Sequence, residues 1–208
     1  MSANTFANIR AIVVVIIALF IVLRAFQVYS QTRSPRLFIL GLTMIMIALT
    51  TTADTIGDNV SFHLNSYWFN YFGQTTNYTF FFFSLINSSE KYLVNLIRWQ
   101  IIVSALLLSV LLIGPAMPYS FPALGVIRAI LSSGRAIPCL CICLYYIAAF
   151  MTKETRFSLL MGVGFLIVCM AYYMIFPRYL YPHQDTIQIT GDFLRATGFA
   201  TLLIALLW

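Results

Sequence analysis

The sequence predicts an all-α protein, a polytopic transmembrane bundle of about seven helices. Of its 208 residues, 61% are hydrophobic and 9% are charged, whereas a soluble domain is typically about 45–50% apolar and about 25% charged. A chain this apolar could not cover its core with a wetted surface, so lipid must solvate most of it. The apolar residues also form runs long enough to cross a bilayer, separated by short loops.

A helix crosses a bilayer with about 17–25 residues. We expect one transmembrane domain, residues 1–208, with spans at about 6–29, 37–57, 67–87, 92–113, 121–151, 157–176 and 187–208. The first span resembles a signal peptide, but Arg24-Ala25-Phe26-Gln27 is no small-residue cleavage site and apolar sequence continues beyond it. We therefore expect an uncleaved first span. The third span is interrupted by polar residues.

Lysine and arginine residues predict the orientation, because they concentrate on the cytoplasmic side of a membrane. On one side, in or beside the first, third and fifth loops, lie Arg24, Arg33, Arg36, Lys91, Arg98, Lys153 and Arg156, whereas the other side has Arg10 and Arg178. This bias places the N-terminus outside and the C-terminus in the cytoplasm. The net charge of +6 is thus spread over the ends of the spans, which does not suit a nucleic-acid-binding patch.

Several chemistries lack the residues that they need. The lysines, Lys91 and Lys153, both lie in expected loops, so no span offers a Schiff-base lysine for retinal. Cys139 and Cys143 share a helix face from which Cys141 points away, and three such thiols cannot converge on one metal ion. Neither Gly-x-Ser-x-Gly nor a phosphate-binding loop occurs. We therefore expect no catalytic residues, metal or cofactor, and no enzyme.

Polar residues inside the spans are the candidates for function, because they are costly in lipid. The fifth span carries Arg128, Ser132 and Arg135 at i, i+4 and i+7, on one face. At about 1.5 Å per residue, Arg135 lies about 21 Å from the start of the span, close to the bilayer midplane. Pro138 is expected to kink the helix beside it.

Three other spans have polar stripes. In the seventh, Asp192 and Arg195 are close enough to pair, and Gly191 and Gly198 permit close helix approach. The second carries Thr43, Thr50 and Asp54, and the third Asn70, Gln74 and Asn77. We expect these stripes to converge on one outward-facing cavity lined by Asp54, Asn77, Arg128, Ser132, Arg135, Asp192 and Arg195. Tyr172 and Tyr173, in the sixth span, are interpreted as interfacial anchors.

Two interpretations of these charges remain open. In the first, Asp54, Asp58 and Asp192 neutralise the arginines and the polar core is purely structural, which the cost of an unpaired charge in lipid favours. In the second, Arg128 and Arg135 hold a small anionic or polar ligand, because guanidinium groups suit carboxylate and phosphate.

The arrangement resembles the seven-helix sensory regions that precede histidine kinase or cyclic-dinucleotide modules in bacteria. The resemblance extends over the whole chain as a pattern and includes the segment from Gly191 to Phe199, followed by a leucine-rich run. It implies a signalling protein of a bacterial inner membrane. Because no effector follows Trp208, we expect either a trimmed sensor region or a separate cytoplasmic or membrane signalling partner.

We therefore predict a membrane sensor or receptor-like module with a small polar or anionic ligand. Two alternatives are an accessory or scaffold subunit of a membrane complex and a small transporter. A transporter would need a polar stripe that continues to the cytoplasmic side. The inner halves of the spans are largely apolar, which counts against transport.

Overall fold

The computed structural model describes residues 3–59, 66–113, 124–179 and 185–208, and they are almost entirely helical. The elements are α1 (Ala3–Thr32), α2 (Pro35–Asn59), α3 (Ser66–Ile86), α4 (Glu90–Ile113), α5 (Leu124–Gly134), α6 (Ala136–Lys153), α7 (Arg156–Ile175), the 3-10 helix η1 (Phe176–Tyr179) and α8 (Asp185–Leu207). No strand occurs in these ranges. The all-α prediction is confirmed.

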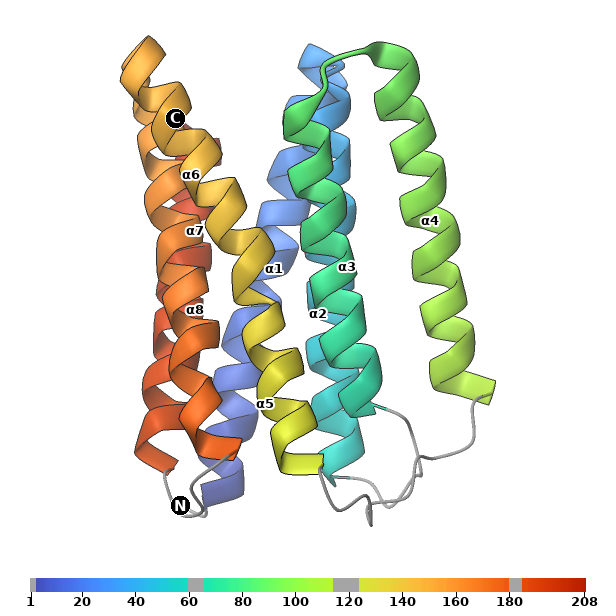
Figure 1. Cartoon of the computed structure of the whole chain (residues 1–208), viewed down its shortest axis with the longest axis vertical. Coiled ribbons are helices and arrows are strands. Elements are labelled where there is room, and N and C mark those ends of the chain that lie inside the picture. The colour runs from blue at the N-terminus through green and yellow to red at the C-terminus, as the bar shows by residue number, and fades with distance from the viewer. Residues whose placement is uncertain (1–2, 60–65, 114–123, 180–184) are drawn as a thin grey trace. The chain divides into compact units, whose positions relative to one another are not determined.

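The helices form two compact units, residues 1–116 with α1–α4 and residues 117–208 with α5–α8. Within each unit, successive helices run in opposite directions, except that α6 continues the direction of α5 (Figure 1). In the first unit α2 packs against α1 and α3, and in the second unit α7 packs against α6 and α8. The sequence analysis expected one transmembrane domain over residues 1–208, which would include both units. This expectation stays a prediction.

All seven expected spans correspond to helices, with α5 and α6 together forming the fifth. Within the described ranges, six helical segments are long and apolar enough to cross a membrane, and α3 is not among them. Its polar residues Asn70, Gln74 and Asn77 are buried against other helices rather than exposed. The outside position of the N-terminus stays a prediction.

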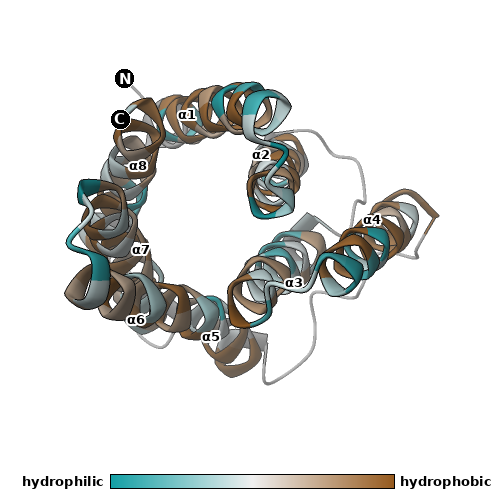
Figure 2. Cartoon of the chain, turned by 90° about the horizontal axis from the view of Figure 1, so that it is seen from above, coloured by the Kyte–Doolittle hydropathy of each residue, from teal (hydrophilic) through white to brown (hydrophobic). Residues whose placement is uncertain are grey.

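The outer surfaces of the helices are apolar, as a lipid solvent requires. Exposed apolar residues include Leu112 at 74% and Met151 at 77%. Hydrophobic stretches occur on every helix (Figure 2). A water-soluble protein rarely exposes so much contiguous apolar surface, so the chain is a membrane protein.

Short connections hold the antiparallel helices together. After α1, Arg33 has a φ of 53° and its amide donates to the Tyr29 carbonyl oxygen at 2.8 Å, which ends the helix. Pro35 then begins α2, where a proline costs no hydrogen bond. After α6, Glu154 is also left-handed, and the Thr155 hydroxyl caps α7 by accepting from the Ser158 amide.

Glycines let α7 and α8 approach closely. A Cβ atom on Gly198 would lie 2.6 Å from Val168 Cγ2 and 3.0 Å from the Gly164 carbonyl oxygen. A Cβ atom on Gly191 would lie 2.7 Å from Ile175 Cγ1. The predicted close packing at Gly191 and Gly198 is confirmed, because at both positions α8 lies directly against α7.

Candidate functional site

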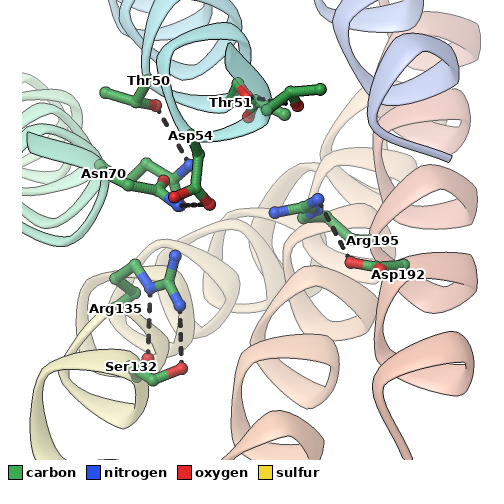
Figure 3. A network of polar contacts seen from close by, with 10 residues as sticks. Thr50, Thr51, Asp54, Asn70, Ser132, Arg135, Asp192 and Arg195 are labelled. Carbon is green, nitrogen blue, oxygen red and sulfur yellow. Dashed lines mark hydrogen bonds and ion pairs between the residues drawn. The ribbon is translucent and has the colours of Figure 1, made fainter. Parts of the chain in front are cut away.

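Among the charged residues whose side chains the structure describes, Arg135 is the most deeply buried of those that the sequence singled out, and the residue is 3% exposed. It stands between α5 and α6, where Nη2 donates to the Ser132 hydroxyl at 2.8 Å and Nε to the Ser132 carbonyl oxygen at 3.4 Å (Figure 3). Its guanidinium carbon lies 4.5 Å from the ring centroid of Tyr172 on α7. Ser132 and Arg135 therefore lie on one side, as their spacing predicted, and their ligand-binding role stays a prediction.

The break that holds Arg135 is explained by proline chemistry. Pro138 has no backbone N–H and cannot donate to the carbonyl oxygen of Gly134, four residues before it. α5 accordingly ends at Gly134 and α6 begins at Ala136, while Arg135 itself keeps right-handed helical angles (φ −67°, ψ −26°). The helix is thus interrupted beside the buried guanidinium, close to Pro138, and the kink expected there stays a prediction.

Tyr172 differs from its expected role. It is fully buried, whereas its neighbour Tyr173 is largely exposed. The interpretation of Tyr172 as an interfacial anchor is therefore wrong, because adjacent residues of a helix point to different sides and Tyr172 is on the inner one. Its ring provides an electron-rich face for the Arg135 guanidinium, which stabilises the buried cation.

Asp192 and Arg195 form the ion pair that their spacing predicted. Arg195 Nη2 lies 3.3 Å from Asp192 Oδ1, and the two side chains are 10% and 13% exposed. Both come from one face of α8 (Figure 3), between the two glycines that contact α7. The pair neutralises two charges that lipid would disfavour.

In the first unit, a ladder of polar pairs joins α2 to α3. Asn70 Nδ2 donates to Asp54 Oδ2 at 2.7 Å, and Gln74 Nε2 donates to Thr50 Oγ1 at 3.1 Å. The first of these contacts is drawn in Figure 3. A Cβ atom on Gly73 would lie 2.6 Å from Thr50 Cγ2, so this glycine allows the approach. Asp54 is thus tied to α3 by an amide.

Farther along the same interface, a buried cluster links three helices. Thr43 (α2), Asn77 (α3) and Gln100 (α4) are all fully buried. Gln100 Nε2 donates to Asn77 Oδ1 at 2.9 Å and to Thr43 Oγ1 at 3.1 Å. Asn77 Nδ2 donates to the Gly73 carbonyl oxygen at 2.9 Å. Asn77 is therefore engaged inside the first unit by both of its polar atoms, and its ligand-binding role stays a prediction.

Gln100 was missed by the sequence reasoning. The sequence does contain a signal for it, because Gln100 is a polar amide in the otherwise apolar stretch of α4 between Arg98 and Ser104. Intramembrane amides are rare and bond to neighbouring helices. Its Oε1 has no hydrogen-bond partner among the described residues.

Part of the site predicted from the sequence is not tested by the structure. The side chain of Arg128 lies outside the described residues, as does that of Asp58. The cavity expected from the sequence would combine residues of both units: Asp54 and Asn77 from the first, and Ser132, Arg135, Asp192 and Arg195 from the second. This convergence stays a prediction. Within the described ranges, no group of three or more histidine, cysteine or acidic residues could hold a metal ion.

The four cysteines are free thiols in the apolar helices α6 and α7. Cys139 and Cys143 are buried, whereas Cys141 is partly exposed, as the helical spacing predicted.

No protein-family model, no curated protein and no solved structure matches the chain.

Proposed function

We propose that the chain is a membrane sensor or receptor-like module that binds a small anionic or polar molecule at Arg135. The observation that carries this proposal is the position of that guanidinium, buried at a helix break and held by Ser132 and the Tyr172 ring. A cation fixed in a low-dielectric site attracts carboxylate or phosphate groups strongly. Ser132 orients the guanidinium before a ligand arrives, which lowers the entropic cost of binding.

The same residue lies where a helix can bend. Because the backbone hydrogen bond at Pro138 is missing, the angle between α5 and α6 is easier to change than that of a continuous helix. A ligand that contacts Arg135 more favourably at one angle would shift the population toward that angle. The energy available for the shift is the difference between the ligand's affinities for the two states.

A change at the break can pass to α8 by direct packing. Tyr172 brings α7 into contact with Arg135, and the glycine contacts join α7 to α8. At the far end of this pair, the Arg156 guanidinium carbon lies 5.7 Å from the ring centroid of Trp208. We propose that a separate cytoplasmic or membrane signalling partner binds at this end of α7 and α8.

Anion-dependent stability of the full chain in nanodiscs tests the ligand site. Thermal unfolding would be followed with inorganic phosphate, sulfate and succinate, with glucose as the uncharged control. A ligand at 100 times its Kd stabilises the folded state by about 2.7 kcal/mol. We expect at least one anion, and not glucose, to raise the Tm of the wild type.

Two variants locate the effect. Arg135→Gln should abolish the anion response, while Lys153→Gln, which removes an exposed cation at the end of α6, should keep it. Arg135→Lys keeps the charge but loses the two-point contact with Ser132, so it should weaken the response rather than remove it. An Arg135→Gln protein that responds like the wild type would refute the proposal, as would a wild type that responds to no anion.

A further inference from the structure

The first three turns of α4 carry a feature that the sensor proposal does not use. A shallow hollow there is lined by Glu90, Lys91, Val94, Asn95 and Arg98. All five side chains are exposed. Lys91, Asn95 and Arg98 follow one another at i, i+4 and i+7, so they share one face of the helix.

The two cations of this hollow need a partner. Neither Lys91 nor Arg98 makes a hydrogen bond or ion pair with any residue that the structure describes. Arg98 lies about 12 Å along the helix from Glu90, at about 1.5 Å per residue. An exposed guanidinium so far along an apolar membrane helix is costly unless an anion or water reaches it. Its long side chain can extend toward the membrane surface to meet one.

Beyond Arg98, exposed apolar side chains continue along the same face of α4. Ile102, Leu106 and Val110 follow Arg98 at intervals of four residues, and all are exposed, as is Val94 one turn before Arg98. Trp99 is 55% exposed beside Arg98, and tryptophan favours the headgroup region of a bilayer. The face therefore changes from basic to aromatic to aliphatic along the helix, in the order in which a phospholipid presents phosphate, glycerol and acyl chains.

We infer that this face of α4 binds an anionic phospholipid, with its phosphate at Lys91 and Arg98 and one acyl chain along Ile102, Leu106 and Val110. Arginine binds phosphate oxygens in pairs, and lysine adds a second positive charge. Basic residues at the membrane surface attract anionic headgroups. Glu90 opposes this attraction at the outer edge of the hollow, and its removal should strengthen binding.

Native mass spectrometry of the full chain tests the inference with an equimolar mixture of phosphatidylglycerol and phosphatidylethanolamine. The wild type should retain phosphatidylglycerol several-fold in preference to phosphatidylethanolamine. Lys91→Gln/Arg98→Gln should lose that preference, and Glu90→Gln should increase it. The matched control is Arg33→Gln/Lys153→Gln, which removes two other exposed cations and should keep the preference.

A second measurement does not depend on the charge variants. In a Trp68→Phe/Trp208→Phe chain, Trp99 is the remaining tryptophan, and its fluorescence should be quenched more by brominated phosphatidylglycerol than by brominated phosphatidylethanolamine. Equal quenching by the two lipids would overturn the inference. Equal loss of preference in the double variant and the matched control would also overturn it, because the effect would then be that of total charge.

Discussion

Gly198→Ala should destabilise the second unit, because the added Cβ atom has no space between α7 and α8. It would lie 2.6 Å from Val168 Cγ2, 3.0 Å from the Gly164 carbonyl oxygen and 3.1 Å from the Val168 amide nitrogen. The first of these atoms can rotate away, but the two backbone atoms can move only if the helices separate. Overpacking of this kind costs about 1–3 kcal/mol.

Two other glycines provide an internal scale. At Gly191 the nearest atom is Ile175 Cγ1 at 2.7 Å, which belongs to a side chain that can rotate, and the nearest backbone atom is 3.3 Å away. At Gly134 nothing lies within 4 Å. The expected order of destabilisation is therefore Gly198→Ala, then Gly191→Ala, then Gly134→Ala, with the last within about 0.5 kcal/mol of the wild type.

The assay is reversible unfolding in detergent micelles by increasing mole fractions of SDS, followed by circular dichroism. In a Trp68→Phe/Trp99→Phe background, the fluorescence of Trp208, directly after α8, gives a second signal. In this medium the unfolded state keeps much of its helix, so the differences report packing rather than helix propensity. A Gly198→Ala protein as stable as Gly134→Ala would refute the close α7–α8 contact and the route from Arg135 to α8.

Two further predictions follow from the buried contacts. Gln100→Leu should lower the stability of the first unit by about 1 kcal/mol, because it removes the hydrogen bonds from Gln100 to Asn77 and Thr43, each worth about 0.6 kcal/mol in membrane proteins. SDS unfolding measures this change in stability. An unchanged unfolding midpoint would contradict the cluster of Thr43, Asn77 and Gln100. Pro138→Ala should straighten the α5–α6 break by restoring a backbone donor. In a cysteine-free background, the distance between spin labels at Ile130 and Leu144 should then increase, and an unchanged distance would mean that another contact causes the break.

Much of the fold could be predicted from local sequence. The spans followed from apolar length, the break from Pro138, the α8 ion pair from the i, i+3 spacing of Asp192 and Arg195, and the close packing from Gly191 and Gly198. Each of these features depends on residues within a few turns of one helix. Helical periodicity and backbone chemistry determine them without knowledge of the neighbouring helices.

The contacts between helices were harder to predict. The sequence interpretation looked for acidic partners of Arg135, but the side chains in contact with it include a hydroxyl, Ser132, and an aromatic ring, Tyr172. The rotation of α7 about its axis decides whether Tyr172 or Tyr173 points inward, and an almost uniformly apolar helix gives no periodic signal of its rotation. For Gln100 the apolar surroundings in the sequence indicate a buried amide, but its partners lie on two other helices, α2 and α3, and could not be predicted.

The seven-helix fold requires lipid around helices whose polar faces point inward. α3 tests this directly, because it is not among the six helical segments that are long and apolar enough to cross a membrane. Its phenylalanines form a matched set, with Phe72 and Phe83 43% and 41% exposed and Phe69 and Phe81 3% and 1% exposed. Power-saturation EPR of spin labels at these four positions in liposomes measures access to oxygen, which concentrates in lipid, and to a nickel chelate, which stays in water. High oxygen access at Phe72 and Phe83 with low access at Phe69 and Phe81 is the expected result. Strong nickel access at Phe72 and Phe83 would contradict a lipid-embedded α3 and the seven-helix bundle with it.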